Sequence, residues 1–96
     1  MALYISLLTF TQKGVEAVKH QAGRMDAIKE AYRAAGGELV AYYATMGQYD
    51  GVAIYRMPDD VSAASFILST MSMGNVRSET MRAFAEDEYR QILDKL

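Results

Sequence analysis

The side chains that could do chemistry in this sequence fall into small groups, and the first is Tyr49 with Asp50. The two residues follow one another in the segment 47–51, which also holds two glycines. A phenol beside a carboxylate can donate and accept hydrogen bonds at the mouth of a cavity. The same residues suit a tight turn, in which the aspartate accepts from backbone amides and the tyrosine packs on a neighbouring element. Turn statistics favour the second interpretation, and both stay open.

The second group consists of Arg77, Glu79 and Arg82. Residues two apart in a strand share one face, so Arg77 and Glu79 are expected together and Arg82 on the opposite face. Under a partner subunit, an Arg–Glu pair could bridge subunits, and an arginine could hold a carboxylate or phosphate ligand. On a solvated edge strand, the same charges would only deter aggregation. We prefer an anion site as the functional interpretation.

Tyrosines in the apolar segments form a third group, from which we retain Tyr43 and Tyr55. Such tyrosines are more typical of packing between two sheets than of a ligand cage. They could also give an apolar pocket a few polar groups. The ligand-binding candidates are therefore Tyr43, Tyr49, Asp50, Tyr55, Arg77, Glu79 and Arg82.

Composition restricts the chemistry further. The chain has 96 residues, 51% of them hydrophobic and 23% charged, which predicts one globular domain over residues 1–96. With no cysteine, disulfides, thiolate metal sites and cysteine nucleophiles are excluded. The single histidine, His20, argues against a histidine metal site or a catalytic dyad, so we expect neither a metal nor a cofactor.

Charge and hydropathy exclude other classes of partner. Ten basic and twelve acidic residues give a net charge of −2, and the acidic excess lies in residues 86–96. No stretch clusters enough Lys and Arg for nucleic-acid binding. No run approaches the roughly 20 apolar residues that span a bilayer, and the apolar start lacks the basic residues of a signal peptide. We expect a cytoplasmic protein that binds neither nucleic acid nor membrane.

Apolar periodicity and turn residues predict the elements. Apolar residues at spacings of three and four run from Val15 to Ala35, which is typical of a helix with one buried face. Thr11 is suited to cap this helix, Gly23 predicts a break near 21–23, and the glycines at 36–37 end it. The predicted strands cover residues 2–10, 39–46, 52–57 and 75–84, and the predicted helices cover 12–35, 60–73 and 86–96.

Three finer predictions concern contacts between these elements. A turn that closes symmetrically about residues 48 and 49 would place Tyr42 near Tyr55. The predicted helix at 60–73 would be capped by Asp59 or Asp60, would end at Gly74 and would have one apolar side. Its apolar residues would be Ala64, Ile67, Leu68 and Met71. The last helix is amphipathic, with Tyr89, Ile92, Leu93 and Leu96 on one side.

This order of elements is that of the α+β ferredoxin-like fold, βαββαβ with a four-stranded antiparallel sheet, plus a C-terminal helix. Right-handed crossovers place both helices on one face of the sheet. The first three strands carry apolar residues at both parities, whereas a sheet with one solvated face alternates. We therefore expect a second subunit to bury the open face, as in a dimeric α+β barrel. Which parity faces the helices stays open.

With these elements in place, the chain resembles the GYD-domain family, small bacterial and archaeal proteins of largely unknown function. The resemblance rests on Gly47-x-Tyr49-Asp50 and on the strand sequence GNVRSETMRAF at 74–84. Thr11 with Gly14, the glycines at 36–37 and the Pro-Asp-Asp segment at 58–60 add to it, so it covers nearly the whole chain. Residues 21–23 depart from the Ser-Pro type of break expected there. The resemblance implies a ferredoxin-like fold and oligomerisation, without an established reaction.

Two functions are compatible with these observations. The first is an oligomeric module that binds a small apolar or anionic ligand or assembles with partners, most simply with copies of itself through the open sheet face. The second is a cofactor-independent monooxygenase or isomerase acting in an enclosed barrel pocket, which rests on fold analogy. We favour binding, because candidate acids and bases are few.

Overall fold

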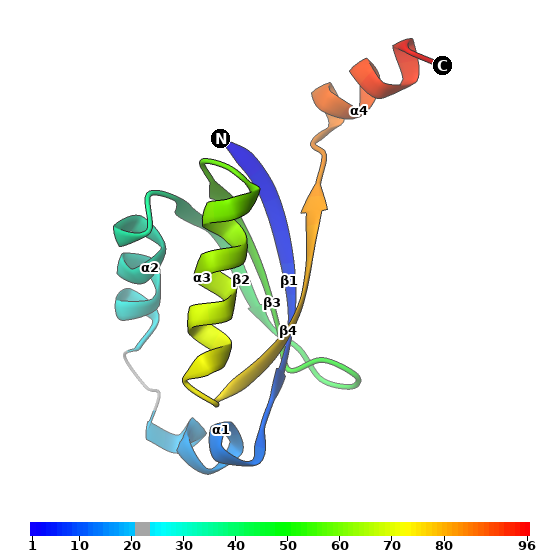
Figure 1. Ribbon diagram of the computed structural model, residues 1–96. Coiled ribbons are helices and arrows are strands. Elements are labelled where there is room, and N and C mark those ends of the chain that lie inside the picture. Colours follow the sequence, from blue (N-terminus) through cyan, green and yellow to red (C-terminus); the bar gives the residue numbers. More distant parts are fainter. Residues whose placement is uncertain (21–23) are drawn as a thin grey trace.

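The computed structural model describes residues 1–20 and 24–96 (Figure 1). Its elements are β1 (Ala2–Phe10), α1 (Gln12–Ala17), the 3₁₀ helix η1 (Val18–His20), α2 (Arg24–Ala34), β2 (Glu38–Ala44), β3 (Gly51–Met57), α3 (Asp60–Ser72), β4 (Val76–Ala83) and α4 (Glu86–Asp94). The four strands form one antiparallel sheet in the order β2-β3-β1-β4. The predicted ferredoxin-like α+β fold with an added C-terminal helix is confirmed.

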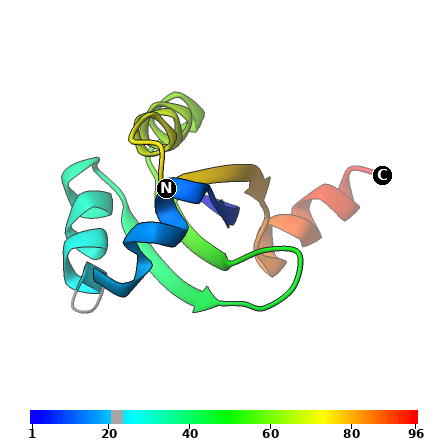
Figure 2. The same cartoon turned by 90° about the horizontal axis from the view of Figure 1, so that it is seen from below.

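Helices α2 and α3 lie on the same face of the sheet, and the opposite face is open (Figures 1 and 2). Strand register decides which side chains meet the helices. Tyr4 of β1 is opposite Tyr55 of β3 and Arg82 of β4, so these positions share the helix-covered face. The buried core on this face consists of Tyr4, Tyr32, Ala53, Tyr55, Met57, Ala63 and Ile67.

Local signals in the sequence explain where the helices begin and end. The Thr11 side chain accepts a hydrogen bond from the backbone N–H of Gly14 (3.1 Å), and Asp59 Oδ1 accepts from that of Ser62 (2.8 Å). Gly36 and Gly74 follow α2 and α3 with φ angles of 90° and 84°, a conformation that glycine adopts readily. The predicted caps and stops are thus confirmed. The predicted break at 21–23 lies outside the described residues.

The predicted pairing of Tyr42 with Tyr55 is wrong. Tyr42 is opposite Ala53, and Tyr55 is opposite Leu39. The connection between β2 and β3 is centred earlier in the chain than the predicted turn, which is symmetric about residues 48 and 49. In addition, the register shifts between Leu39 and Ala41, where a β-bulge leaves Val40 as an extra residue.

The predicted core side of α3 is also partly wrong. Ala63 and Ile67 are buried, whereas Ala64 is exposed and Leu68 is 63% exposed. Apolar residues occupy consecutive positions in this helix, so periodicity alone did not fix which of them meets the sheet. Asp59 caps α3 and the small Ala63 packs on the sheet. The buried face of α3 is therefore shifted by about one residue from the face that we predict.

Helix α4 stands away from the rest of the fold, beyond the end of β4 (Figures 1 and 2). The predicted apolar stripe is present, and its members are exposed in the described chain. They are Tyr89, Ile92, Leu93 and Leu96, and the preceding Phe84 is also exposed. The acidic residues at the start of α4 favour the helix through its dipole.

Candidate functional site

The loop between β2 and β3 holds Asp50, which fastens this loop to the end of β1. Its Oδ2 accepts a hydrogen bond from the backbone N–H of Phe10 (2.8 Å). Its own N–H donates to the carbonyl of Leu8 (2.8 Å), and its carbonyl accepts from Thr45 N–H (3.1 Å). Asp50 thus acts as a turn residue that also caps the neighbouring strand, as one of the two sequence interpretations expects.

Tyr49 extends the same loop toward the edge strand β4. Its hydroxyl donates a hydrogen bond to Glu79 Oε2 (2.9 Å). This bond to a carboxylate raises the pKa of the Tyr49 phenol. Two of the candidates from separate groups are therefore in direct contact, which joins the loop to β4 across the end of β1.

The open face of the sheet carries the other exposed candidates. In the β4 register, Glu79 is opposite Leu7 and Arg77 is opposite Thr9, so both acidic and basic side chains lie on this face. Tyr43 is opposite Val52 on the same face and is 60% exposed. The strand parity predicted for Arg77 and Glu79 is confirmed. The apolar positions of this face are Leu3, Ile5, Leu7, Ala41, Val52, Ile54 and Met81.

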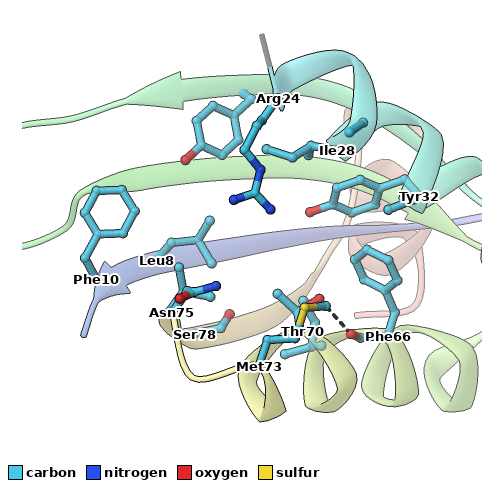
Figure 3. Close-up of a pocket in the computed structure, with 15 residues that line it drawn as sticks. Leu8, Phe10, Arg24, Ile28, Tyr32, Phe66, Thr70, Met73, Asn75 and Ser78 are labelled. Atoms are coloured by element: carbon cyan, nitrogen blue, oxygen red, sulfur yellow. Dashed lines mark hydrogen bonds between the residues drawn. The ribbon is translucent and has the colours of Figure 1, made fainter. Parts of the chain in front are cut away.

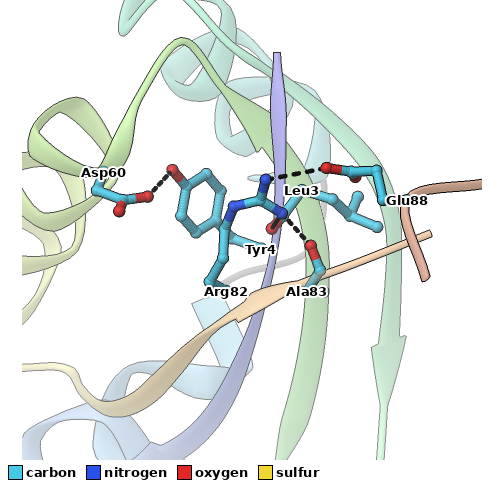
Figure 4. A network of polar contacts seen from close by, with 6 residues as sticks. All are labelled: Leu3, Tyr4, Asp60, Arg82, Ala83 and Glu88. Carbon is cyan, nitrogen blue, oxygen red and sulfur yellow. Dashed lines mark hydrogen bonds and ion pairs between the residues drawn. The ribbon is translucent and has the colours of Figure 1, made fainter. Parts of the chain in front are cut away.

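Arg82 lies on the helix-covered face, at the end where β4 leads into α4 (Figure 4). Its guanidinium group lies over the ring of Phe84 at 4.6 Å and over the ring of Tyr4 at 5.8 Å. It donates to Glu88 Oε2 of α4 (3.2 Å) and to the carbonyl of Ala83. Arg82 is therefore separated from Arg77 and Glu79, and it connects the sheet to α4.

Tyr4 extends this network to the start of α3. Its hydroxyl donates a hydrogen bond to Asp60 Oδ1 (2.6 Å), as Figure 4 shows. Burial, together with the Asp60 carboxylate, raises the pKa of Tyr4 to about 12. The phenol is therefore held in its neutral, donating form.

Tyr55 is fully buried beneath the helices. Its hydroxyl shares a hydrogen bond with Ser6 Oγ (2.8 Å), and Ser6 shares another with Thr80 Oγ1 (2.8 Å). Burial raises the pKa of Tyr55, and the hydrogen bonds from Ser6 and Thr80 partly oppose that shift. The structure thus places Tyr55 in the core, apart from Tyr43 and Tyr49.

Our sequence interpretation missed a cavity of about 230 Å³ between α2, α3 and the sheet (Figure 3). The rings of Tyr32 and Phe66 meet across the two helices at 4.5 Å and close one end of it. Leu8 and Phe10 form part of its floor. The remaining lining residues are Arg24, Ala27, Ile28, Ala31, Tyr42, Ile67, Thr70, Met73, Asn75, Val76 and Ser78.

A few polar groups interrupt this apolar lining. The guanidinium group of Arg24 points into the cavity from the start of α2, and Asn75 and Ser78 lie across from it (Figure 3). The Oδ1 atom of Asn75 is buried and has no hydrogen-bond partner among the described residues. Burial raises the pKa of both tyrosines in the lining, Tyr32 and Tyr42.

One signal in the sequence could have indicated the cavity. Ala27 and Ala31 are four apart, so they lie on one side of α2, and both line the space. Small side chains where a helix crosses a sheet leave unfilled volume. The periodicity of this helix predicts one buried face and gives no indication of unfilled space.

None of the helices at 1–20 and 24–96 combines the length and apolar character needed to cross a membrane. Within the same residues, no three histidine or acidic side chains gather in a way that could hold a metal ion.

Comparison with known proteins places the chain in a family. A Thermus thermophilus protein named "Glutamine synthetase and cystathionine beta-lyase binding protein" is 32% identical over 84 residues, 86% of this chain and 88% of that protein. A crystal structure of a protein from Thermus thermophilus matches with a TM-score of 0.56 and 24% identity over 88% of this chain and 95% of the other. A hypothetical protein from Pyrococcus horikoshii matches with a TM-score of 0.56 and 20% identity, covering 90% and 93%. These two structures support the fold alone.

The family model of the GYD domain matches residues 4–93, which include the Gly-x-Tyr-Asp loop and the whole of β4. The contacts of Tyr49 and Asp50 give that loop its structural role. The chain belongs to the GYD domain family.

Proposed function

We propose that this protein is an assembly module that acts by binding proteins, and that a second copy of the chain covers the open face of its sheet. The observation that carries the proposal is the composition of that face. Its centre is apolar, with Ile5 opposite Ile54 on adjacent strands. Contiguous apolar surface of this kind marks interaction sites in folded proteins.

The charges around this apolar centre favour a copy of the same chain as the partner. Glu38 and Arg56 lie at one end of the face and are 4.0 Å apart. Arg77 and Glu79 lie on β4 at the other end. Two acidic and two basic side chains sum to no net charge, so two copies related by a twofold axis would not repel one another.

Helix α4 offers additional apolar surface for the same interface. It extends beyond the sheet, and Leu93 and Leu96 are exposed on it. In a pair of copies, such an extension could lie against the partner and enlarge the buried area. Exchange of terminal elements is a common way to strengthen a dimer.

The relative from Thermus thermophilus supports a function in protein binding. That protein is named for binding glutamine synthetase and cystathionine beta-lyase. We propose by analogy that the pair formed by this chain presents its outer surfaces to other proteins. A cofactor-independent enzyme, the alternative expected from fold analogy, stays a prediction.

Light scattering coupled to size-exclusion chromatography tests the pairing. The full chain should elute with twice its mass of 10.7 kDa. The Ile54→Lys variant places a charge at the centre of the open face, and it should elute with the mass of a monomer. Its circular dichroism spectrum should show that it is folded. The matched control is Leu68→Lys on the exposed side of α3, which should stay dimeric. A monomeric wild type, or a dimer unaffected by Ile54→Lys, would overturn the proposal.

A further inference from the structure

The cavity between α2, α3 and the sheet has the size and lining of a small-molecule site. An apolar cavity of about 150 Å³ is enough to hold benzene. The cavity here is about 230 Å³, which corresponds roughly to one ring with a short chain attached. The aromatic rings of Tyr32 and Phe66 close one end and would contact an apolar body.

Arg24 gives the cavity a positive charge. Its guanidinium group points inward, between Ile28 and Leu8 (Figure 3). The ion pairs found within residues 1–20 and 24–96 use other arginines, namely Arg33, Arg56, Arg82 and Arg90. Arg24 is an exposed residue of the described chain, and the planar donors of its guanidinium match a carboxylate in a two-bonded geometry.

Asn75 adds a polar side chain to the lining of the cavity. Its side-chain amide lines the cavity, and its Oδ1 atom is buried without a hydrogen-bond partner in the described chain. Folded proteins pair nearly all such atoms, and each exception needs an explanation. The two ends of an amide can exchange by rotation, so Asn75 could offer either a donor or an acceptor to a ligand. The nearby hydroxyl of Ser78 could do the same.

We propose that this cavity binds a small monocarboxylate with an apolar body, such as an aryl-substituted short-chain acid. The carboxylate would lie between Arg24 and the Asn75 and Ser78 side chains, and the apolar body would point toward Tyr32 and Phe66. Among the described lining residues Arg24 is the one cation, which matches a ligand with a single negative charge. The site is on the helix-covered side of the sheet, so it is independent of the pairing proposed for the open face.

Titration of the full-length protein with 3-phenylpropionate tests this site. Backbone NMR should show shifts concentrated in α2, α3 and the start of β4, and calorimetry should give saturable binding. The Arg24→Gln variant should bind at least tenfold more weakly, because it loses the charge-assisted bond. Arg33→Gln on the same helix, outside the cavity lining, is the matched control and should bind as the wild type does.

A neutral probe separates the charge from the volume. 3-Phenylpropan-1-ol should bind weakly and equally to the wild type and to Arg24→Gln. Ser78→Phe, which fills the cavity, should abolish binding of both probes. The melting curve of this variant reports whether it folds. If Ser78→Phe does not fold, the comparison of Arg24→Gln with the wild type decides alone. Shifts confined to the open face or α4, equal affinity of Arg24→Gln for the acid, or no binding at millimolar concentration would overturn the proposal.

Discussion

The hydroxyl of Tyr49 donates a hydrogen bond of 2.9 Å to Glu79, thirty positions further along the chain. This contact ties the β2–β3 loop to β4, whereas Asp50 in the same loop holds the end of β1. Two adjacent loop residues thus hold two different strands, β1 and β4. In this chain, both side chains of the Gly-x-Tyr-Asp loop therefore have a structural role, whatever the protein binds.

Replacing Asp50 tests this role directly. Asp50→Ala removes the acceptor of the Phe10 amide, which is partly buried, and should lower the free energy of unfolding by about 1–3 kcal/mol in urea. Asp50→Asn keeps an acceptor oxygen and should lose less. Asp94→Ala, in the last turn of the exposed α4, is the control and should stay within about 0.5 kcal/mol of the wild type. Equal losses for the Ala and Asn variants of Asp50 would contradict the bond.

Gly14 should tolerate no side chain. A Cβ atom there would lie 2.0 Å from the carbonyl oxygen of Asn75, a backbone atom that cannot easily move. Gly14→Ala should therefore destabilise the fold by about 1–3 kcal/mol, measured by thermal or urea denaturation. The comparison variant is Gln12→Ala, exposed on the same helix. The contact would be disproved if Gly14→Ala melted at the wild-type temperature.

The buried hydroxyls of Ser6 and Tyr55 should be energetically coupled. Ser6→Ala leaves the Tyr55 phenol without its 2.8 Å partner in the core, which should cost about 1–3 kcal/mol. In a Tyr55→Phe background the same change should cost at least about 0.5 kcal/mol less, because no phenol is left unpaired. Urea denaturation of the four proteins closes this cycle. Simple additivity of the two changes would show that the pair does not interact.

Stability should fall at high pH, and Tyr4 should contribute to this fall. The unfolded chain releases this phenolic proton near its ordinary pKa of 10, whereas the folded chain holds it until about pH 12. Between these values unfolding releases a proton, so the free energy of unfolding decreases as pH rises. Tyr4→Phe should show a shallower decrease over this window in urea denaturation at several pH values. Equal slopes for Tyr4→Phe and the wild type would refute the assignment.

Arg82 should stabilise helix α4 against local unfolding. Arg82→Met removes the bond to Glu88 and the contact with the Phe84 ring, so hydrogen exchange over residues 86–94 should accelerate. Arg90→Met loses a pair with Glu86 in which both side chains are largely exposed, and it serves as the matched control. If both variants exchanged alike, Arg82 would not be the residue that holds the helix.

Local signals in the sequence predicted most of the fold. Thr11, Asp59, Gly36 and Gly74 set the ends of helices through their own side chains or backbone angles, so neighbouring residues were sufficient to place them. Strand parity likewise separated Arg82 from Arg77. Such features depend on a few adjacent residues, and this is why they could be read without a structure.

Features that depend on distant elements could not be predicted in the same way. The face of α3 that meets the sheet is chosen by packing, since Phe66, Ile67 and Leu68 are all apolar. The contact of Tyr49 with Glu79 needed the length and path of a loop. The cavity is defined by what α2 and α3 leave unfilled, and no single residue carries that information.

The bulge at Val40 has a consequence for changes in chain length. Deleting one residue within β1, β3 or β4 would move every following side chain in that strand to the opposite face, so core and open surface would exchange. Val40 lies outside the ladder, between Leu39 opposite Tyr55 and Ala41 opposite Ile54. Its removal would leave both neighbours on their own faces. Val40 of β2 is therefore a position whose deletion would leave the neighbouring side chains on the helix-covered face and on the open face where they are.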